Sequence, residues 1–249
     1  MTQHQRPGVS DLGAVPTVRK LSNRSSEELA MREMLVPWMR QRWPGARIIH
    51  ELPLRYSTNR IDLAAVTETE INAVEIKSSR DVADRLEQQI RAFAPISARV
   101  IVALAPKWNE QLPPVRKTLR CGGTTYSPQR TPVQATIHKI GASHVETWTV
   151  AVDASSMERT EGGYVTNDHP WAYQMLHILH VAELWQVASR HQVYLHGKSP
   201  THATIVRDCC HALTGAQVKR AVCAALRARE AFCGGTDPAV PLPPVGAVA

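Results

Sequence analysis

Three charged residues interrupt two apolar segments in the first third of the chain. The stretch RIDLAAVTETEINAVEIKSS, residues 60 to 79, places Asp62 in one apolar run and Glu75 and Lys77 in the next. A charged group that is buried without partners is costly, so three in adjacent segments need a shared explanation. Either these side chains face solvent, or together they form a site.

Side-chain alternation along a strand indicates how such a site would be arranged. Glu75 and Lys77 are two residues apart and therefore share one face of a strand, while Val74 and Ile76 share the other. If the preceding strand pairs with this one, Asp62 comes alongside. Two converging carboxylates repel each other unless a cation lies between them, and hard oxygen ligands favour Mg²⁺ or Mn²⁺. The pattern predicts a magnesium or manganese site.

Hydrophobic periodicity indicates the elements that would position these residues. A Ser cap and a helical spacing of apolar residues predict an amphipathic helix from Ser25 to Gln41. Apolar runs bounded by turn residues predict strands within residues 46–56, 60–67, 71–79 and 98–106. The intervening segment, residues 81–96, is expected to be a helix. Helix, three strands, helix and strand in this order favour an α/β fold whose mixed sheet contains a parallel pair.

The second of these helices is expected to open at an Asp cap and to end before Pro95. Its apolar face would consist of Val82, Leu86, Ile90 and Phe93.

The order of elements, together with "ID" followed 13 residues after the Asp by "EIK", resembles the PD-(D/E)XK nuclease superfamily over about residues 25–106. The resemblance implies the restriction-endonuclease-like core, α-β-β-β-α-β, with a mixed sheet flanked by helices. It also implies that Asp62 and Glu75 hold the metal together with the Ile76 carbonyl. Lys77 would orient or activate the attacking water and offset developing charge.

Two further positions follow from the same resemblance. In the resembling families a glutamate of the first helix often reaches the metal, a role that Glu28 or Glu27 could fill, with Glu51 on the first strand as a rival. Gln89, with Phe93 four residues later, is similar to the Q-x-x-x-aromatic helix motif of the RecB-like branch.

The chain departs from the motif name at the "P", because Arg60 and Ile61 precede the Asp, a departure that is common in the superfamily. Its overall look is similar to small bacterial and phage-borne endonucleases, including the MmcB-like DNA-repair group.

The rest of the chain predicts a less regular middle and a helical end. Residues 124–140 and 143–155 have β-type alternation, and residues 157–168 read as a loop. Residues 171–191 are expected to be one long amphipathic helix, and residues 201–230 two more that turn near "LTG". We therefore expect a flexible N-terminal arm (1–24), a nuclease-like domain (25–165), a helical C-terminal region (166–232) and a disordered tail (233–249).

Charge and composition point to a polyanionic partner. The chain of 249 residues carries a formal net charge of +7. Lys219, Arg220 and Arg227 lie in a basic C-terminal helix that would either contact the DNA backbone or form a solvated face. His177 and His180 have metal-ligand spacing, but no second pair completes a set, so core or surface histidines are the better interpretation. The spacing of the five cysteines favours reduced thiols.

The sequence thus predicts a Mg²⁺- or Mn²⁺-dependent nuclease that hydrolyses phosphodiester bonds in DNA, in repair, processing, or phage- or defence-related DNA metabolism. The alternative is a catalytically inactive nuclease fold that serves as a DNA-binding or adaptor module. No apolar run is long enough to span a bilayer and the N-terminus lacks a signal-peptide pattern, so a cytoplasmic protein is expected. The sequence does not indicate which DNA structure is preferred, whether the substrate is DNA or RNA, or whether cleavage is exonucleolytic or endonucleolytic. Whether the protein forms a homodimer also stays open.

Overall fold

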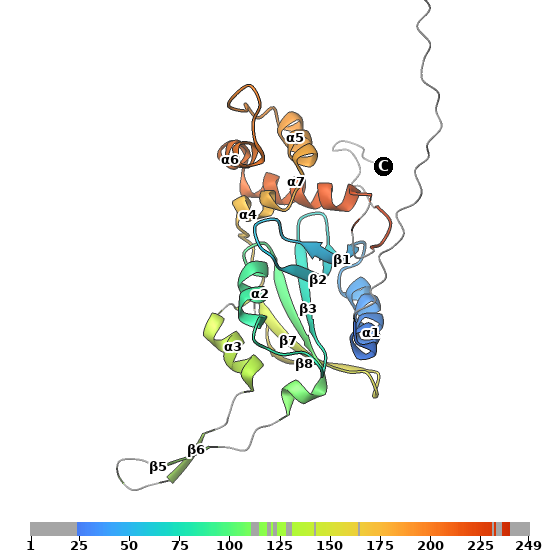
Figure 1. The fold of residues 1–249 in the computed structure, drawn as a ribbon, viewed down its shortest axis with the longest axis vertical. Coiled ribbons are helices and arrows are strands. Elements are labelled where there is room, and N and C mark those ends of the chain that lie inside the picture. Colours follow the sequence, from blue (N-terminus) through green and yellow to red (C-terminus); the bar gives the residue numbers. More distant parts are fainter. Residues whose placement is uncertain are drawn as a thin grey trace, which may run out of the picture.

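The fold is mixed α/β in the computed structural model, which describes residues 24–110, 115–118, 121, 124–127, 131–141, 143–163, 165–230, 232 and 236–239. Within those residues there are seven α-helices and one six-stranded sheet (Figure 1). The helices are α1 Ser26–Arg42, α2 Leu86–Phe93, α3 Pro132–Ile140, α4 Ala172–His177, α5 Val181–Arg190, α6 His202–Ala212 and α7 Gly215–Ala228, with a 3-10 turn, η1, at Pro106–Asn109. The strands are β1 Arg47–Pro53, β2 Arg60–Val66, β3 Ile71–Lys77, β4 Arg99–Leu104, β5 Val115–Thr118, β6 Thr124–Ser127, β7 Val145–Ala151 and β8 Ser156–Gly162.

The six-stranded sheet has the order β1-β2-β3-β4-β7-β8. Strands β1, β2 and β3 form an antiparallel meander, β3, β4 and β7 run parallel, and β8 returns antiparallel to β7. The predicted succession of helix, three strands, helix and strand is confirmed, and so is the parallel pair at its end. A separate hairpin of β5 and β6 projects from the body (Figure 1).

Helix α1 covers one face of the sheet. It begins as predicted, because the Ser25 hydroxyl accepts a hydrogen bond from the Glu28 N–H at 3.1 Å and two acidic residues lie in the first turn. Its apolar stripe is fully buried against Val74 and Ile76 of β3, among other residues of that face. The stripe consists of Met31, Leu35 and Met39.

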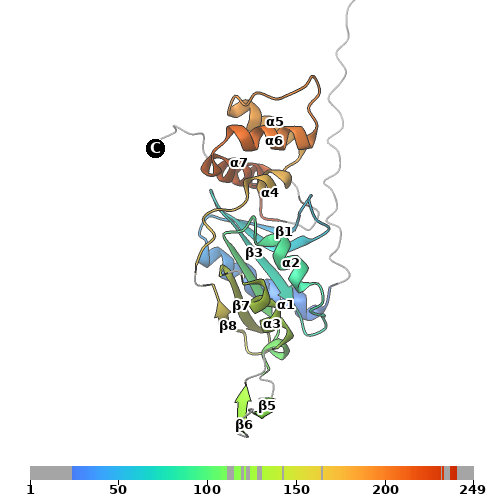
Figure 2. The ribbon, with the colours of Figure 1, turned by 90° about the vertical axis from the view of Figure 1, so that its left-hand side faces the viewer.

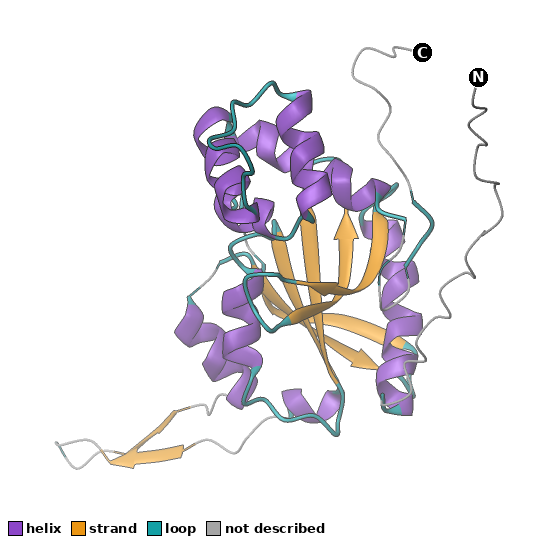
Figure 3. Cartoon of the chain, turned by 45° about the horizontal axis from the view of Figure 1, so that its top comes forward, coloured by secondary structure: helices purple, strands orange, loops and turns teal. Residues whose placement is uncertain are grey.

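Helices α2 and α3 cover the opposite face, and α4 to α7 gather at the end of the molecule next to β1 and β2 (Figures 2 and 3). Ile71 and Ala73 of β3 share a single buried cluster with Ile90 and Phe93 of α2 and with apolar residues of α4 to α7. The alternation predicted for β3 is therefore observed, since neighbouring residues belong to the two different cores.

Two buried arginines join the C-terminal helices to the sheet. Arg47 on β1 is fully buried and its guanidinium donates to the carbonyls of Leu226, Arg227 and Arg229 at 2.9, 2.9 and 2.5 Å. In return, Arg227 on α7 donates to the carbonyls of Gly45 and Val66 at 2.8 and 2.9 Å. Helix α7 is thus attached to the sheet by backbone acceptors on both sides.

The predicted start of the second helix is wrong. Helix α2 begins at Leu86, and Val82 lies outside it with 64% of its surface exposed. Asp81, the expected cap, instead accepts hydrogen bonds from the backbone and hydroxyl of Ser78 at 2.7 and 2.8 Å. Asp81 closes the turn that follows β3. A short acidic side chain can stabilise such a turn as well as cap a helix.

The middle of the chain also differs from the prediction. Residues 132–140 form helix α3 where β-type alternation was inferred, because Thr131 and Gln134 make a reciprocal capping box and Pro132 occupies the first turn. The expected loop at residues 157–168 contains most of β8, which pairs with β7. The β-type reading of residues 143–155 is confirmed by β7.

In the C-terminal region the two predicted helices before and after "LTG" are confirmed as α6 and α7. The long helix expected over residues 171–191 is wrong. It is divided into α4 and α5, because His180 adopts an extended conformation and its backbone N–H is capped by Glu183 at 2.6 Å.

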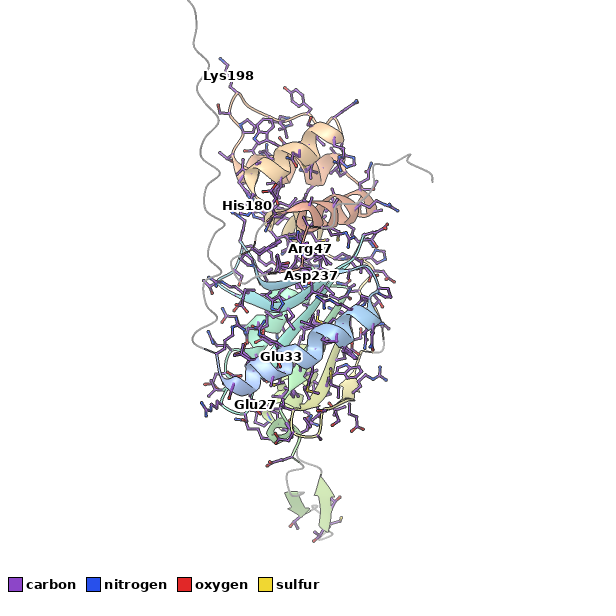
Figure 4. All side chains as sticks on the ribbon, turned by 90° about the vertical axis from the view of Figure 1, so that its right-hand side faces the viewer. Glu27, Glu33, Arg47, His180, Lys198 and Asp237 are labelled. Carbon is purple, nitrogen blue, oxygen red and sulfur yellow. The ribbon has the colours of Figure 1, made fainter. Side chains whose placement is uncertain are left out.

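Of the expected arm, residues 1–24, only Arg24 is among the described residues, and most of the expected tail lies outside them. Within that tail, Thr236 forms an antiparallel β-bridge with Ile49, and the Asp237 carboxylate accepts the Ile48 N–H at 3.1 Å (Figure 4). The prediction of disorder is therefore wrong for this short stretch. The four described cysteines are free thiols, as predicted, and Cys233 lies outside the described part. Among the described helices none is long and apolar enough to cross a membrane.

Candidate functional site

The site begins where the ladder between β2 and β3 stops. Regular pairing runs from Val66 opposite Ile71 to Leu63 opposite Val74. One residue further, the Asp62 carboxylate replaces the ladder and accepts the Ile76 N–H at 2.8 Å. The Asp62 carboxylate therefore lies against the backbone of β3, beside Glu75.

Glu75 and Lys77 point toward α2 and are almost completely buried. The Lys77 Nζ donates to Glu75 Oε1 at 2.7 Å and to Gln89 Oε1 at 2.9 Å. Glu75 is 1% exposed, and its Oε2 is a buried oxygen that has no hydrogen-bond partner among the described residues. The predicted residues Asp62, Glu75, Lys77 and Gln89 are thus brought together.

Burial dominates the electrostatics of the two acids. It raises the pKa of Glu75 to about 8, with the neighbouring Asp62 adding to the effect and Lys77 and Gln89 opposing it. Burial also raises the pKa of Asp62 to about 6; the Ile76 N–H opposes this shift and Glu51 adds to it. The Asp62 carboxylate makes ionisation of Glu75 harder, as expected for two acids that share a site.

Two arginines that sequence reasoning missed lie among the acids. Arg32 on α1 is 4% exposed and donates to Glu28 and Glu51, both at 3.0 Å, and its Nη2 lies 3.4 Å from Asp62 Oδ1. Arg24 pairs with Glu28 and Glu51 as well. The available signal was the position of Arg32, which directly follows the buried Met31 of the apolar stripe.

The structure also separates the three candidates for an additional acid. Glu28 and Glu51 are both joined to the cluster through Arg32. Glu51 stands where pairing between β1 and β2 is interrupted, and its φ of 55° is strained for a residue other than glycine. Glu27 lies apart and accepts the backbone N–H of Ser79 at 2.7 Å.

The donor set fits a divalent cation in part. The unpartnered Glu75 Oε2 and the mutual repulsion of Asp62 and Glu75 are what a bound cation would relieve. On the other hand, Arg32 already lies near one Asp62 oxygen. Among the described residues no group of three or more His, Cys, Asp or Glu side chains is arranged to hold a metal ion.

The basic residues predicted to contact DNA differ in accessibility. Arg220 is exposed, and Lys219 is partly buried with its Nζ 3.1 Å from the Asp168 carbonyl. Arg227 is 6% exposed and bound to two carbonyls of the sheet region, so the prediction of a DNA contact is wrong for this residue. It joins α7 to the sheet instead.

A comparison with protein families gives a match to part of the chain. The model of the family described as Bacteriophage P4 protein cII matches residues 22–116, less than half of the chain. This similarity spans α1 to β4, and therefore all residues of the site described above. No curated protein and no solved structure matches this chain.

Proposed function

We propose that this protein is a metal-dependent nuclease that hydrolyses phosphodiester bonds in DNA, built on a core of the PD-(D/E)XK type. One observation carries the proposal. Glu75 has a buried, unpartnered carboxylate oxygen next to a second carboxylate, Asp62, and next to the ammonium of Lys77. A lone structural ion pair needs no second acid in the same dry environment.

Each residue has a distinct task in this proposal. Asp62 and Glu75, with the Ile76 carbonyl, would hold Mg²⁺ or Mn²⁺, which when bound polarises the phosphate and lowers the pKa of water. Because the pKa of Glu75 is raised, this carboxyl must release its proton before it can serve as a ligand.

Lys77 places a positive charge at the same position, where it can orient water and offset the charge that develops on the phosphate. Gln89 acts as a positioning residue, since its Oε1 accepts from the Lys77 Nζ at 2.9 Å.

A cleavage assay tests the proposal. Labelled linear, nicked and branched DNA is incubated with Mg²⁺, with Mn²⁺ or with a chelator. Wild-type protein is expected to cleave with metal, whereas Asp62→Asn and Lys77→Met are expected to lose activity by about a hundredfold or more. Matched controls are Glu33→Gln on the exposed side of α1 and the exposed Lys139→Met on α3, which should cleave like the wild type. Activity that survives in both site variants would contradict the proposal.

A second candidate is a nucleic-acid-binding or adaptor protein that has the same core without catalysis. The observation in its favour is that Arg24 and Arg32 already neutralise Glu28, Glu51 and, in part, Asp62. This candidate predicts salt-dependent DNA binding, weakened by substitution of Lys219 or Arg220, and no product with any metal.

A further inference from the structure

A row of rings lies on α4 and α6, away from the acids. The rings of Tyr173 and His177 have their centroids 4.5 Å apart, and those of His177 and His202 are 5.1 Å apart. Tyr173 is 51% exposed, so the row begins at the molecular surface. The row thus offers an open aromatic face at one end.

An exposed guanidinium accompanies this row. The exposed Arg55, on the loop between β1 and β2, places its Nη1 3.1 Å from Nδ1 of His180, the residue that separates α4 from α5. His180 lies at the boundary between the C-terminal helices and the strands (Figure 4). Burial lowers the pKa of His177, and the nearby His202 and Arg55 lower it further, so the guanidinium and the rings act on one another.

In the described part of the chain, the carboxylate that acts on His180 is already paired. The groups that act on His180 are Arg229, Glu183, Arg55 and His202, and Glu183 is the carboxylate among them. Both Glu183 oxygens are held by Arg229 at 2.7 Å. Nε2 of His177 is buried and has no partner in the described part of the chain. Arg55 is exposed and pairs with no carboxylate among the described residues, so an anion bound here would offset its charge.

Metal binding does not account for these histidines, because the described residues contain no metal-ligating group of three. A duplex offers its phosphates but keeps its bases stacked inside. A single strand offers both phosphates and open base faces, and stacking on an exposed ring beside cations is how proteins hold it without sequence preference.

We propose that Arg55, Tyr173, His177, His180 and His202, called here the ring cluster, bind a single-stranded segment of nucleic acid. A base stacks on Tyr173, and a backbone phosphate lies at Arg55 and His180. The inference rests on the proposed function, whose substrate class it narrows to DNA with an unpaired stretch, such as an overhang or a flap.

Fluorescence anisotropy with a labelled oligothymidylate tests the ring cluster. The full chain carrying Asp62→Asn is used with a chelator, so that binding is measured without cleavage. Tyr173→Leu and Arg55→Gln, each added to that background, are expected to weaken binding at least about fivefold. Tyr194→Leu and Arg190→Gln, which change an exposed tyrosine and an exposed arginine elsewhere in the helical region, should bind like the parent. Thermal melts establish that all variants are folded.

The possible results distinguish binding at the ring cluster from binding elsewhere. Weaker binding by both ring-cluster variants, unchanged binding by both controls, and preference for the single strand over a blunt duplex of equal length support the inference. Parent-like binding by either ring-cluster variant, equal losses in the controls, or a duplex bound as tightly as the single strand would overturn it. Absence of cleavage by the wild type would count against the nuclease and leave this binding test intact.

Discussion

The Asp62 carboxylate accepts the Ile76 N–H at 2.8 Å, a hydrogen bond between a side chain of β2 and the backbone of β3 where ladder pairing has ended. This bond holds the Asp62 carboxylate next to that of Glu75. It follows that Asp62→Asn is the informative substitution, because the amide oxygen can still accept from Ile76 while the negative charge is removed.

Stability should fall as the pH rises. The pKa of Glu75 is raised from its ordinary 4.5 to about 8, so between these values the folded protein holds a proton that the unfolded chain has released. More protons on the folded state mean a free energy of unfolding that decreases with pH, by up to about 1.4 kcal/mol per pH unit for one proton. Urea unfolding from pH 5 to 8 measures this slope, and Glu75→Gln should flatten it. A Glu75→Gln variant less stable than the wild type at pH 8 would indicate a structural ion pair with Lys77 instead.

Mn²⁺ should stabilise the folded wild type. A cation that binds only the folded state raises the melting temperature as its free concentration exceeds its Kd, and both carboxylates are needed to hold it. Thermal melts with increasing Mn²⁺ should show a rise for the wild type and none for Asp62→Asn or Glu75→Gln. Without metal these two variants should melt higher than the wild type, because each relieves repulsion between buried acids. An equal response to Mn²⁺ in all three proteins would place the cation elsewhere.

Arg32 should compete with that cation. Its guanidinium contacts the partly buried Glu28, Glu51 and Asp62, so Arg32→Met removes the ion-pair partner of Asp62 and leaves Arg24 as the remaining partner of the two glutamates. The variant should lower the free energy of unfolding by about 3 kcal/mol or more. Added Mn²⁺ should then raise the melting temperature of Arg32→Met by more than that of the wild type. A smaller Mn²⁺ response in the variant would mean that Arg32 supports the cation site, and would contradict competition.

Arg227 and Arg220 lie on the same helix and should behave oppositely. Arg227→Met removes the donor for two carbonyls, those of Gly45 and Val66, and should cost about 1–3 kcal/mol of stability. The exposed Arg220→Met should change stability by less than about 0.5 kcal/mol. Urea unfolding of both variants provides the comparison. Equal effects would show that the bonds of Arg227 contribute nothing measurable.

Much of the site was predictable because strand alternation is a strong local signal. Asp62, Glu75 and Lys77 are placed by the two-residue period of β2 and β3, and a chemical argument from neighbouring residues sufficed. The role of Arg32 was not predictable in this way. Its partners on β1 and β2 are distant in sequence, and its position next to Met31 does not indicate which residues its guanidinium contacts.

The wrong predictions for α3, β8 and Arg227 also arose because the local sequence carries only a weak signal of the structure that forms there. Thr131 and Gln134 form a capping box whose signal was weaker than the apparent β alternation around it, and helix α3 was missed. The exposed residues of β8 read as a loop, because an edge strand carries few apolar residues and its pairing with β7 is a tertiary contact. Arg227 looked like a surface cation, because burial by packing against the sheet leaves no trace in the pattern of α7 itself.

Asp62, Glu75 and Lys77 are proposed to form a metal-dependent catalytic site. The most direct measurement is a Mg²⁺ titration in which gel shift and product formation are followed in the same samples, for the wild type and Asp62→Asn. Both proteins are expected to shift the DNA. Product should increase with Mg²⁺ for the wild type, and Asp62→Asn should form none above background. A wild type that binds DNA and yields no product at any Mg²⁺ or Mn²⁺ concentration would contradict the claim and establish the non-catalytic candidate in its place.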